Sequence, residues 1–284
     1  MLQQKVTDLD SLYLNFSFIK NNQPVNDGPK CGMTIKKAGS MRFRWNEKNP
    51  WREKVLKEIS EDKIPLPIEL IHSQIVYDLN SLKNTEEIKG DGIISQNKEF
   101  MPVLTVADCL PVYLYDNKKK VFGLVHSGWK GTGIIGKAIE LAQKDYDSDP
   151  EDISIIIGPH IHDCCYIVNQ ERASYFAQNF TPSCVKELEE GGKCFAGGRG
   201  LAIEWDNGQE KLFRLSLLKA NLQVLENYKI PRDNILVIDE CTCCNEKFGS
   251  NRRETALASK KMGRKLSVEE AAHNFTVQAA FIRW

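Results

Sequence analysis

Residues 102–127 read PVLTVADCLPVYLYDNKKKVFGLVHS and contain three short apolar runs separated by charged and turn-forming residues. Runs of this length that are rich in Val, Leu and Tyr are typical of buried strands. Similar runs lie on both sides: GIIS at 92–95, ISIIIGP at 153–159 and NILVIDE at 234–240. The spacing of these runs predicts a set of adjacent buried strands in the middle of the chain.

Helical patterns are mixed with these strands without strict alternation. Residues 51–63 place Trp51, Val55, Leu56 and Ile59 on one stripe, which predicts an amphipathic helix. Further helices are expected at 131–147, 171–180, 184–190 and 212–230, and further strands at 70–79, 164–168 and 273–284. Such mixing favours an α+β sandwich over a doubly wound sheet. No linker divides the chain, so we expect one domain over residues 1–284.

The composition is that of an ordinary globular protein. The 284 residues include 38 basic and 38 acidic side chains, for a formal net charge of zero. A nucleic-acid-binding protein usually has a basic excess, so no nucleic-acid partner is expected. The first residues lack the features of a signal peptide, and no apolar run approaches the ~18 residues of a spanning helix. We therefore expect a cytoplasmic protein with no membrane partner.

Three residues at the ends of predicted strands could hold a metal. His is scarce, at five residues, yet His72 and His126 both lie in or beside buried runs, and Cys109 follows Asp108 at the end of another. Two imidazoles and a thiolate suit zinc, and three protein ligands leave a fourth position for water or substrate. The spacing alone does not decide, because buried core histidines and a buried thiol give the same pattern.

The sequence segments around these residues resemble those of a known family. The segments TVADCLPVYLYD, VFGLVHSGWKGTGIIGKAIE and IIIGPHIHDCCYIV are similar, in this order, to the ADCxPV, H-[AS]-G-W-[RK]-G-T and GPxIxxCCYxV segments of the YfiH/LACC1 family of laccase-domain proteins. LIHSQIVYDL resembles its QVHG segment, GDGIIS its ADALVT-type strand, and FGSNRRE its SYRRD segment. The resemblance covers roughly residues 64–284.

The resemblance implies a single-domain, layered α/β/β/α sandwich with mixed sheets. It also implies a zinc-dependent purine nucleoside phosphorylase, acting with phosphate on adenosine, inosine or methylthioadenosine and deaminating some adenosine. The implied zinc ligands are His72, Cys109 and His126. We expect Cys109, His126 and Asp108 to form the catalytic set. The older copper-oxidase label fits poorly, because five histidines in total are too few to hold several coppers.

Other residues carry open alternatives. Asp108 either orients a metal ligand or caps the following turn. Lys130, Arg252 and Arg253 are candidates to hold phosphate or ribose, although Lys130 replaces an arginine of the family and cannot form a bidentate fork. His160 and His162 either move protons or lie exposed in a loop, and we favour the exposed loop. Cys241, Cys243 and Cys244 form a C-x-C-C segment; it differs from the usual C-x₂-C knuckle and so argues against a second zinc shared with Cys164 and Cys165.

Two rival functions remain open. Cys109 with His126 as its base would make a cysteine hydrolase or deamidase. A zinc-binding scaffold without turnover is the other alternative. A homodimer, in which a neighbouring subunit completes the cleft, is compatible with the sequence.

Overall fold

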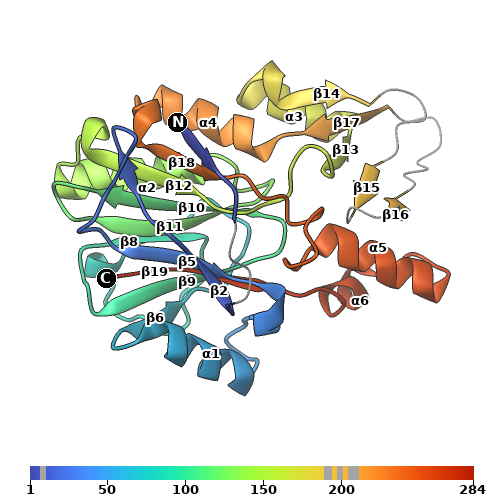
Figure 1. Cartoon of the computed structure of the whole chain (residues 1–284), viewed down its shortest axis with the longest axis horizontal. Coiled ribbons are helices and arrows are strands. Elements are labelled where there is room, and N and C mark those ends of the chain that lie inside the picture. The colour runs from blue at the N-terminus through green and yellow to red at the C-terminus, as the bar shows by residue number, and fades with distance from the viewer. Residues whose placement is uncertain (7–10, 189–193, 197–200, 204–210) are drawn as a thin grey trace.

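The computed structural model describes residues 1–6, 11–188, 194–196, 201–203 and 211–284. Two central sheets organise these residues (Figure 1). The larger has seven strands in the order β1 (Leu2–Gln4), β18 (Ile235–Ile238), β12 (Ile153–Ile157), β10 (Leu110–Asp116), β11 (Phe122–Ser127), β8 (Gly92–Ser95) and β7 (Val76–Asp78). The smaller has five: β2 (Tyr13–Phe16), β5 (Lys30–Thr34), β19 (Gln278–Arg283), β9 (Phe100–Val106) and β6 (Ile64–Pro67).

The strand pairing is mixed in both sheets. In the larger sheet, β10 pairs antiparallel with β11 and β12, whereas β12 and β18 run parallel. A three-stranded sheet joins β13 (Ile167–Asn169), β17 (Leu212–Leu215) and β14 (Val185–Glu187), and two pairs join β3 (Ile19–Lys20) with β4 (Gln23–Pro24) and β15 (Cys194–Ala196) with β16 (Leu201–Ile203).

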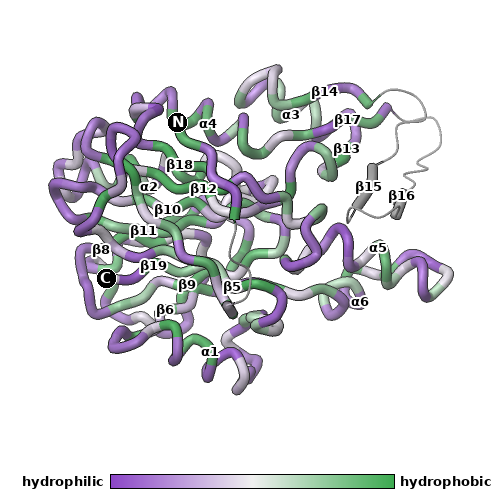
Figure 2. Tube along the Cα trace, viewed as in Figure 1, coloured by the Kyte–Doolittle hydropathy of each residue, from purple (hydrophilic) through white to green (hydrophobic). Residues whose placement is uncertain are grey.

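Helices cover the outer faces of the two sheets, which gives the expected α/β/β/α layers (Figure 1). The helices are α1 (Pro50–Ser60), α2 (Ile134–Tyr146), α3 (Gln170–Asn179), α4 (Leu217–Asn227), α5 (Asn251–Met262) and α6 (Val268–Ala272). One apolar cluster packs α2 and α4 on the larger sheet, a second fills the space between the sheets, and a third packs α1 on the smaller sheet. In Figure 2 the hydrophobic residues gather along the strands between these layers.

Local sequence explains where the helices begin. Asn49 accepts a hydrogen bond from the Arg52 amide and Pro50 opens α1, while Val55, Leu56 and Ile59 are buried as expected. Trp51 does not share this buried stripe: it is half exposed, and its indole nitrogen donates to the Ala38 carbonyl oxygen. An indole has a polar N–H group that can bond a backbone carbonyl, and an apolar pattern alone does not show this preference.

Four predicted elements differ in the structure. Of the strand expected at 164–168, only Ile167 and Val168 lie in a strand, β13. Within residues 70–79 only β7 is a strand, because the chain bends at His72, which has a positive φ of 57°. In the helix expected at 184–190, residues 185–187 form instead the strand β14, paired with β17, and residues 189–190 lie outside the described part of the chain. The helix expected at 212–230 divides into β17 and α4, since the Ser216 side chain accepts from the Lys219 amide and caps a helix that begins at Leu217.

No helix in the described part of the chain is both long enough and apolar enough to cross a membrane.

A hydrogen bond between the two sheets offers a test of this packing. The buried Tyr113 hydroxyl on β10 donates to the Gly32 carbonyl oxygen on β5, at 2.8 Å. We expect Tyr113→Phe to lower the free energy of unfolding by about 1–3 kcal/mol, because it leaves a buried acceptor without this donor. Urea denaturation measures the change. The control Tyr175→Phe, at an exposed position on α3, should stay within about 0.5 kcal/mol.

Candidate metal centre

His72, Cys109 and His126 converge where the chain passes between the two central sheets. His72 lies in the segment that joins β6 of the smaller sheet to β7 of the larger, and Cys109 lies between β9 and β10, which make the same transition. His126 is near the end of β11, opposite Pro111 of β10. One ligand atom from each of the three side chains lies within 4.8 Å of the other two.

Asp91 orients two of these residues. Its Oδ1 accepts from the His72 backbone amide at 3.0 Å and lies 2.9 Å from Nδ1 of His126, while its Oδ2 accepts from the amide and hydroxyl of Ser73. With Nδ1 of His126 bound to the carboxylate, Nε2 is left for a metal or for Cys109. Sequence reasoning missed Asp91. The available signal was an acidic residue placed directly before the buried run GIIS.

Backbone conformation also shapes the centre. His72 and Asp108 both have positive φ, of 57° and 78°, conformations that non-glycine residues adopt mainly where the surrounding structure imposes them. A Cβ atom added to Gly128 would lie 3.1 Å from the Cys109 sulfur and 3.6 Å from Nε2 of His126. The missing side chain at Gly128 therefore leaves room beside the ligand atoms.

The electrostatics favour a thiolate at Cys109. Burial opposes ionisation of this thiol, but the charges of His126 and His72 and their hydrogen bonds lower its pKa to about 6. Burial likewise opposes protonation of His126, but the Cys109 thiolate and Asp91 raise its pKa to about 9. Burial also opposes the ionisation of Asp91, yet hydrogen bonds from His126 and Ser73 hold its pKa below the usual value. A deprotonated thiol is the form that binds metals.

The three residues open into a cavity of about 450 Å³. His72 is exposed, Cys109 is half-buried and His126 is buried, so the ligand set is reached from the cavity side. Its walls come from both sheets, the segment before α1, and the helical cover: Arg42, Phe43, Arg44, Leu70, Thr105, Ala107, Asn251, Val268, Ala271, Ala272, Phe275 and Val277. This volume lies in the range of small-molecule sites. The sequence did not single out Arg42, Phe43 or Arg44.

Asp108 binds the segment that leads into α5. It accepts from the Thr242 hydroxyl at 2.7 Å, the Ser250 hydroxyl at 3.0 Å and the Arg252 amide at 2.7 Å. Burial raises the pKa of Asp108, against these hydrogen bonds. Asp108 therefore caps the start of α5, which is distant in sequence, and fixes the backbone next to Cys109. These hydrogen bonds correspond neither to a cap of the turn that follows Asp108 nor to contact with a metal-ligand side chain.

Arg253 is buried and holds the same loop from the other side. Its guanidinium donates to the carbonyl oxygens of Thr242, Cys243, Asn245 and Phe248. These contacts of the guanidinium are structural, because they hold the backbone of residues 242–248.

Lys130 and Arg252 lie in a second group of cations next to Cys109. Arg172 connects them: its guanidinium stacks 4.3 Å from the Trp129 ring centroid and donates to the Tyr166 hydroxyl at 3.3 Å. Lys130 is exposed, with Nζ 6.0 Å from the Trp129 ring, and Arg252 lies 5.6 Å from the Tyr166 ring. Burial raises the pKa of Tyr166, and the charges of Arg172, Cys109 and Arg252 all act on it. The backbone amide of Arg252 donates to Asp108, the residue before Cys109, and Lys130 follows Gly128, which lies against the Cys109 sulfur, so this cation–aromatic group lies beside Cys109.

The expectation of an exposed loop is wrong for His160. This residue is 1% exposed, and its Nδ1 lies 2.9 Å from the Gly158 carbonyl oxygen. Burial and the neighbouring charge of His162 lower its pKa to about 3, so the ring stays neutral. A parallel bridge between His160 and Cys241 ties this segment to the loop after β18, a long-range pairing that local sequence does not show.

Comparison with known proteins identifies similar chains. The family model described as multi-copper polyphenol oxidoreductase laccase matches residues 52–269. A purine nucleoside phosphorylase of Clostridium acetobutylicum is 40% identical over 37% of this chain and 44% of its own length. A purine nucleoside phosphorylase of Borreliella burgdorferi is 32% identical over 72% of this chain and 84% of its own.

Solved structures share the fold at lower identity. YlmD from Geobacillus stearothermophilus superposes with a TM-score of 0.66 at 20% identity, covering 94% of this chain and 96% of its own. The hypothetical protein YfiH of Bacillus licheniformis gives 0.65 at 20% identity, covering 90% and 92%. These likenesses confirm the expected α+β architecture.

The role of Asp91 is testable. Asp91→Asn keeps the side-chain volume but weakens its acceptor function toward His126, so we expect zinc affinity to fall about 10–100-fold. Competition with a chromophoric chelator measures the affinity, and circular dichroism checks the fold. Asp145→Asn, at an exposed position on α2, serves as the matched control. Unchanged affinity in a folded Asp91→Asn protein would contradict the assignment.

The low pKa of Cys109 gives a pH prediction. In metal-free protein, alkylation of Cys109 should rise as the pH increases through about 6, because the thiolate form reacts and exists above that pKa. Burial raises the pKa of Cys184, so its alkylation should begin only at a higher pH in the same sample. Iodoacetamide labelling with peptide mass spectrometry separates the two sites. A Cys109 midpoint near 9 would show that His72 and His126 do not stabilise the thiolate.

Proposed function

We propose that this chain, which belongs to the family described as multi-copper polyphenol oxidoreductase laccase, is a zinc-dependent purine nucleoside phosphorylase. Two chains similar to it carry the name purine nucleoside phosphorylase. The proposed substrates are phosphate with adenosine, inosine or methylthioadenosine, and deamination of adenosine is the proposed second activity. The observation that supports this most is the three-ligand centre open to a cavity of nucleoside-compatible size.

The donor set fits zinc. Two imidazoles and one thiolate are ligands that zinc favours, and the exposed side of His72 leaves the fourth direction toward the cavity. Zinc bound there would supply Lewis acidity toward an oxygen of phosphate or water. Asp91 holds the ring of His126 in the orientation that presents Nε2, and Gly128 leaves space for the ion. Three ligands do not form a centre for several coppers.

The cavity could accept a nucleoside. Phe43 and Phe275 offer apolar surface on its wall, and the guanidinium groups of Arg42 and Arg44 offer donors. Arg42 forms a bidentate ion pair with Glu47, with both N–O distances 3.1 Å, and Arg44 pairs with Glu69 at 3.2 Å. Because their charges are partly balanced, we assign these arginines to the hydroxyl and base atoms of the nucleoside rather than to phosphate.

We place phosphate by the cation–aromatic group next to Cys109. Arg252 is its proposed main contact, Arg172 supports it, and Lys130 adds a charge at the exposed edge. In phosphorolysis the phosphate attacks C1′ of the ribose and the purine leaves, so these cations would hold the attacking dianion in line with that bond. Arg253 is left out of this set because it is buried and its guanidinium donates to four backbone carbonyls. The guanidinium of Arg252 also donates to a backbone carbonyl, that of Ile167, but Arg252 is only half-buried.

A cysteine hydrolase is the second candidate, and one observation favours it. Cys109, His126 and Asp91 follow the order of a nucleophile, a base and an orienting carboxylate, with Asp91 bonded to Nδ1 of His126. In that reaction the thiolate would attack a carbonyl or amidine carbon. Zinc would inhibit such an enzyme by binding the nucleophile, whereas it would be required by the phosphorylase.

The deciding experiment is product identification from a nucleoside panel, with and without phosphate. Zinc-loaded protein should release free purine and ribose 1-phosphate from adenosine or inosine only when phosphate is present. Chelated protein should lose at least about 90% of this activity and recover it with zinc. Cys109→Ala should lose the activity as well. Full phosphorolysis by the metal-stripped protein would exclude the zinc role.

The phosphate contact has its own test. Arg252→Ala should raise the KM for phosphate about tenfold or more, because it removes a charge-assisted contact of about 1.5–3 kcal/mol, and should change the KM for nucleoside much less. This variant keeps the backbone amide of residue 252, which donates a hydrogen bond to Asp108. Arg232→Ala, an exposed arginine remote from this group, is the matched control. Equal changes in both KM values would argue that Arg252 acts only through the fold.

A further inference from the structure

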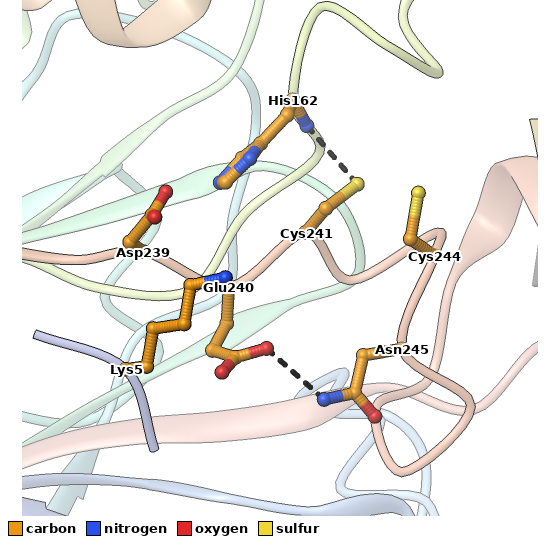
Figure 3. A pocket seen from close by; sticks show the side chains of 7 residues that line it. All are labelled: Lys5, His162, Asp239, Glu240, Cys241, Cys244 and Asn245. Atoms are coloured by element: carbon orange, nitrogen blue, oxygen red, sulfur yellow. Dashed lines mark hydrogen bonds between the residues drawn. The ribbon is translucent and has the colours of Figure 1, made fainter. Parts of the chain in front are cut away.

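Four cysteines from two loops lie together outside the proposed active centre. Cys164 and Cys165 belong to the segment between β12 and β13, and Cys241 and Cys244 to the turns after β18. β12 and β18 are parallel neighbours in the larger sheet, so both segments leave the sheet at the same edge. Figure 3 shows Cys241 and Cys244 beside His162, in a surface cavity of about 330 Å³.

The sulfur atoms have the spacing of a metal site. The Cys164 sulfur lies 3.7 Å from that of Cys165, 3.8 Å from that of Cys241 and 3.6 Å from that of Cys244. Those of Cys165 and Cys244 are 3.3 Å apart. These distances far exceed the ~2.05 Å of a disulfide. Four sulfurs bound tetrahedrally at about 2.3 Å from one zinc ion lie about 3.8 Å from each other, close to the values here.

The sequence spacing of Cys241 and Cys244 also fits a zinc site. Cys241 and Cys244 are separated by two residues and so have the C-x₂-C spacing of zinc knuckles. The C-x-C-C segment had obscured this, because Cys243 stands between them. Cys243 is fully buried in the apolar core and is outside the group of four sulfurs. The expectation that the segment lacks knuckle spacing is therefore wrong.

The surroundings suit a charged thiolate cluster. The His162 backbone amide donates to the Cys241 sulfur at 3.4 Å, as drawn in Figure 3. Arg214 donates to the carbonyl oxygen of Cys164 at 2.9 Å, which places a cation next to the cluster. The adjoining cavity is lined by Lys5 but also by Asp239 and Glu240, so it adds no net positive charge. A zinc ion with four thiolates carries two negative charges, which Arg214 and the His162 amide would partly balance.

We propose that Cys164, Cys165, Cys241 and Cys244 bind one zinc ion in a closed tetrathiolate site, separate from the centre at His72, Cys109 and His126. Four protein ligands leave no open position, so its role is structural. The site joins the segment after β12 to the segment after β18. Thr242, between two of these ligands, bonds Asp108 next to Cys109. Zinc at the cysteine site thus stabilises one wall of the active centre.

Zinc content, measured by mass spectrometry of the metal in protein purified with reductant, tests the proposal. The wild-type chain should bind two equivalents of zinc. Cys109→Ala and Cys244→Ser should each bind one, and the double variant none. The control Cys243→Ala removes a cysteine from the same turn but not from the cluster, and should keep two. This outcome does not depend on phosphorylase activity.

Cobalt spectroscopy of the Cys109→Ala protein adds a second readout, which reports the ligands of the bound metal and not only its amount. Cobalt should give the intense visible and thiolate charge-transfer bands of a tetrahedral sulfur site, and Cys164→Ser or Cys244→Ser in this background should remove them. The proposal is overturned if folded Cys109→Ala protein binds no zinc while its four thiols remain titratable, or if peptide mapping finds these cysteines joined as disulfides.

Discussion

The buried carboxylate of Asp91 is the constraint on which the candidate metal centre depends. It binds Nδ1 of His126 on β11 and the backbone amide of His72 before β7, two elements on either side of β8. A buried carboxylate is costly unless hydrogen bonds stabilise its charge, and four such contacts do so here. The same contacts fix the positive φ of His72 and orient the imidazole of His126. Without them neither histidine would point at Cys109.

The position of the centre follows from the two-sheet architecture. A chain that passes from one packed sheet to the next must leave regular pairing, so His72 and Cys109 lie in segments free to adopt unusual backbone angles. Strands in both sheets hold the ends of these segments rigidly. The site thus combines local strain with a rigid surrounding, as expected of a preorganised centre. Asp108 adds to this rigidity by binding the turn after β18 and the start of α5.

The loop after β18 connects the two proposed metal sites. Arg253 binds its carbonyl oxygens, Asp108 binds Thr242, and Cys241 and Cys244 face the segment after β12. A single short loop is thereby held from three directions. Its conformation sets the start of α5, whose residue Asn251 lines the cavity. The loop that carries these structural contacts therefore leads directly into one wall of the cavity.

Local sequence determined the elements whose signals are local. The buried runs at 153–157 and 278–283 are strands, and the helix after Asn49 begins next to its capping residue, because apolar periodicity and side-chain caps act within a few positions. The segments around His72, Cys109 and His126 resemble those of the family, and this resemblance identified three residues that the structure brings together. Only the tertiary structure decided the rest: the strand at 185–187 depends on pairing with β17, and Asp91 and the four-cysteine cluster depend on residues far apart in the chain. The physical reason is that burial, long-range hydrogen bonds and ligand geometry are properties of neighbours in space, which no window of sequence contains.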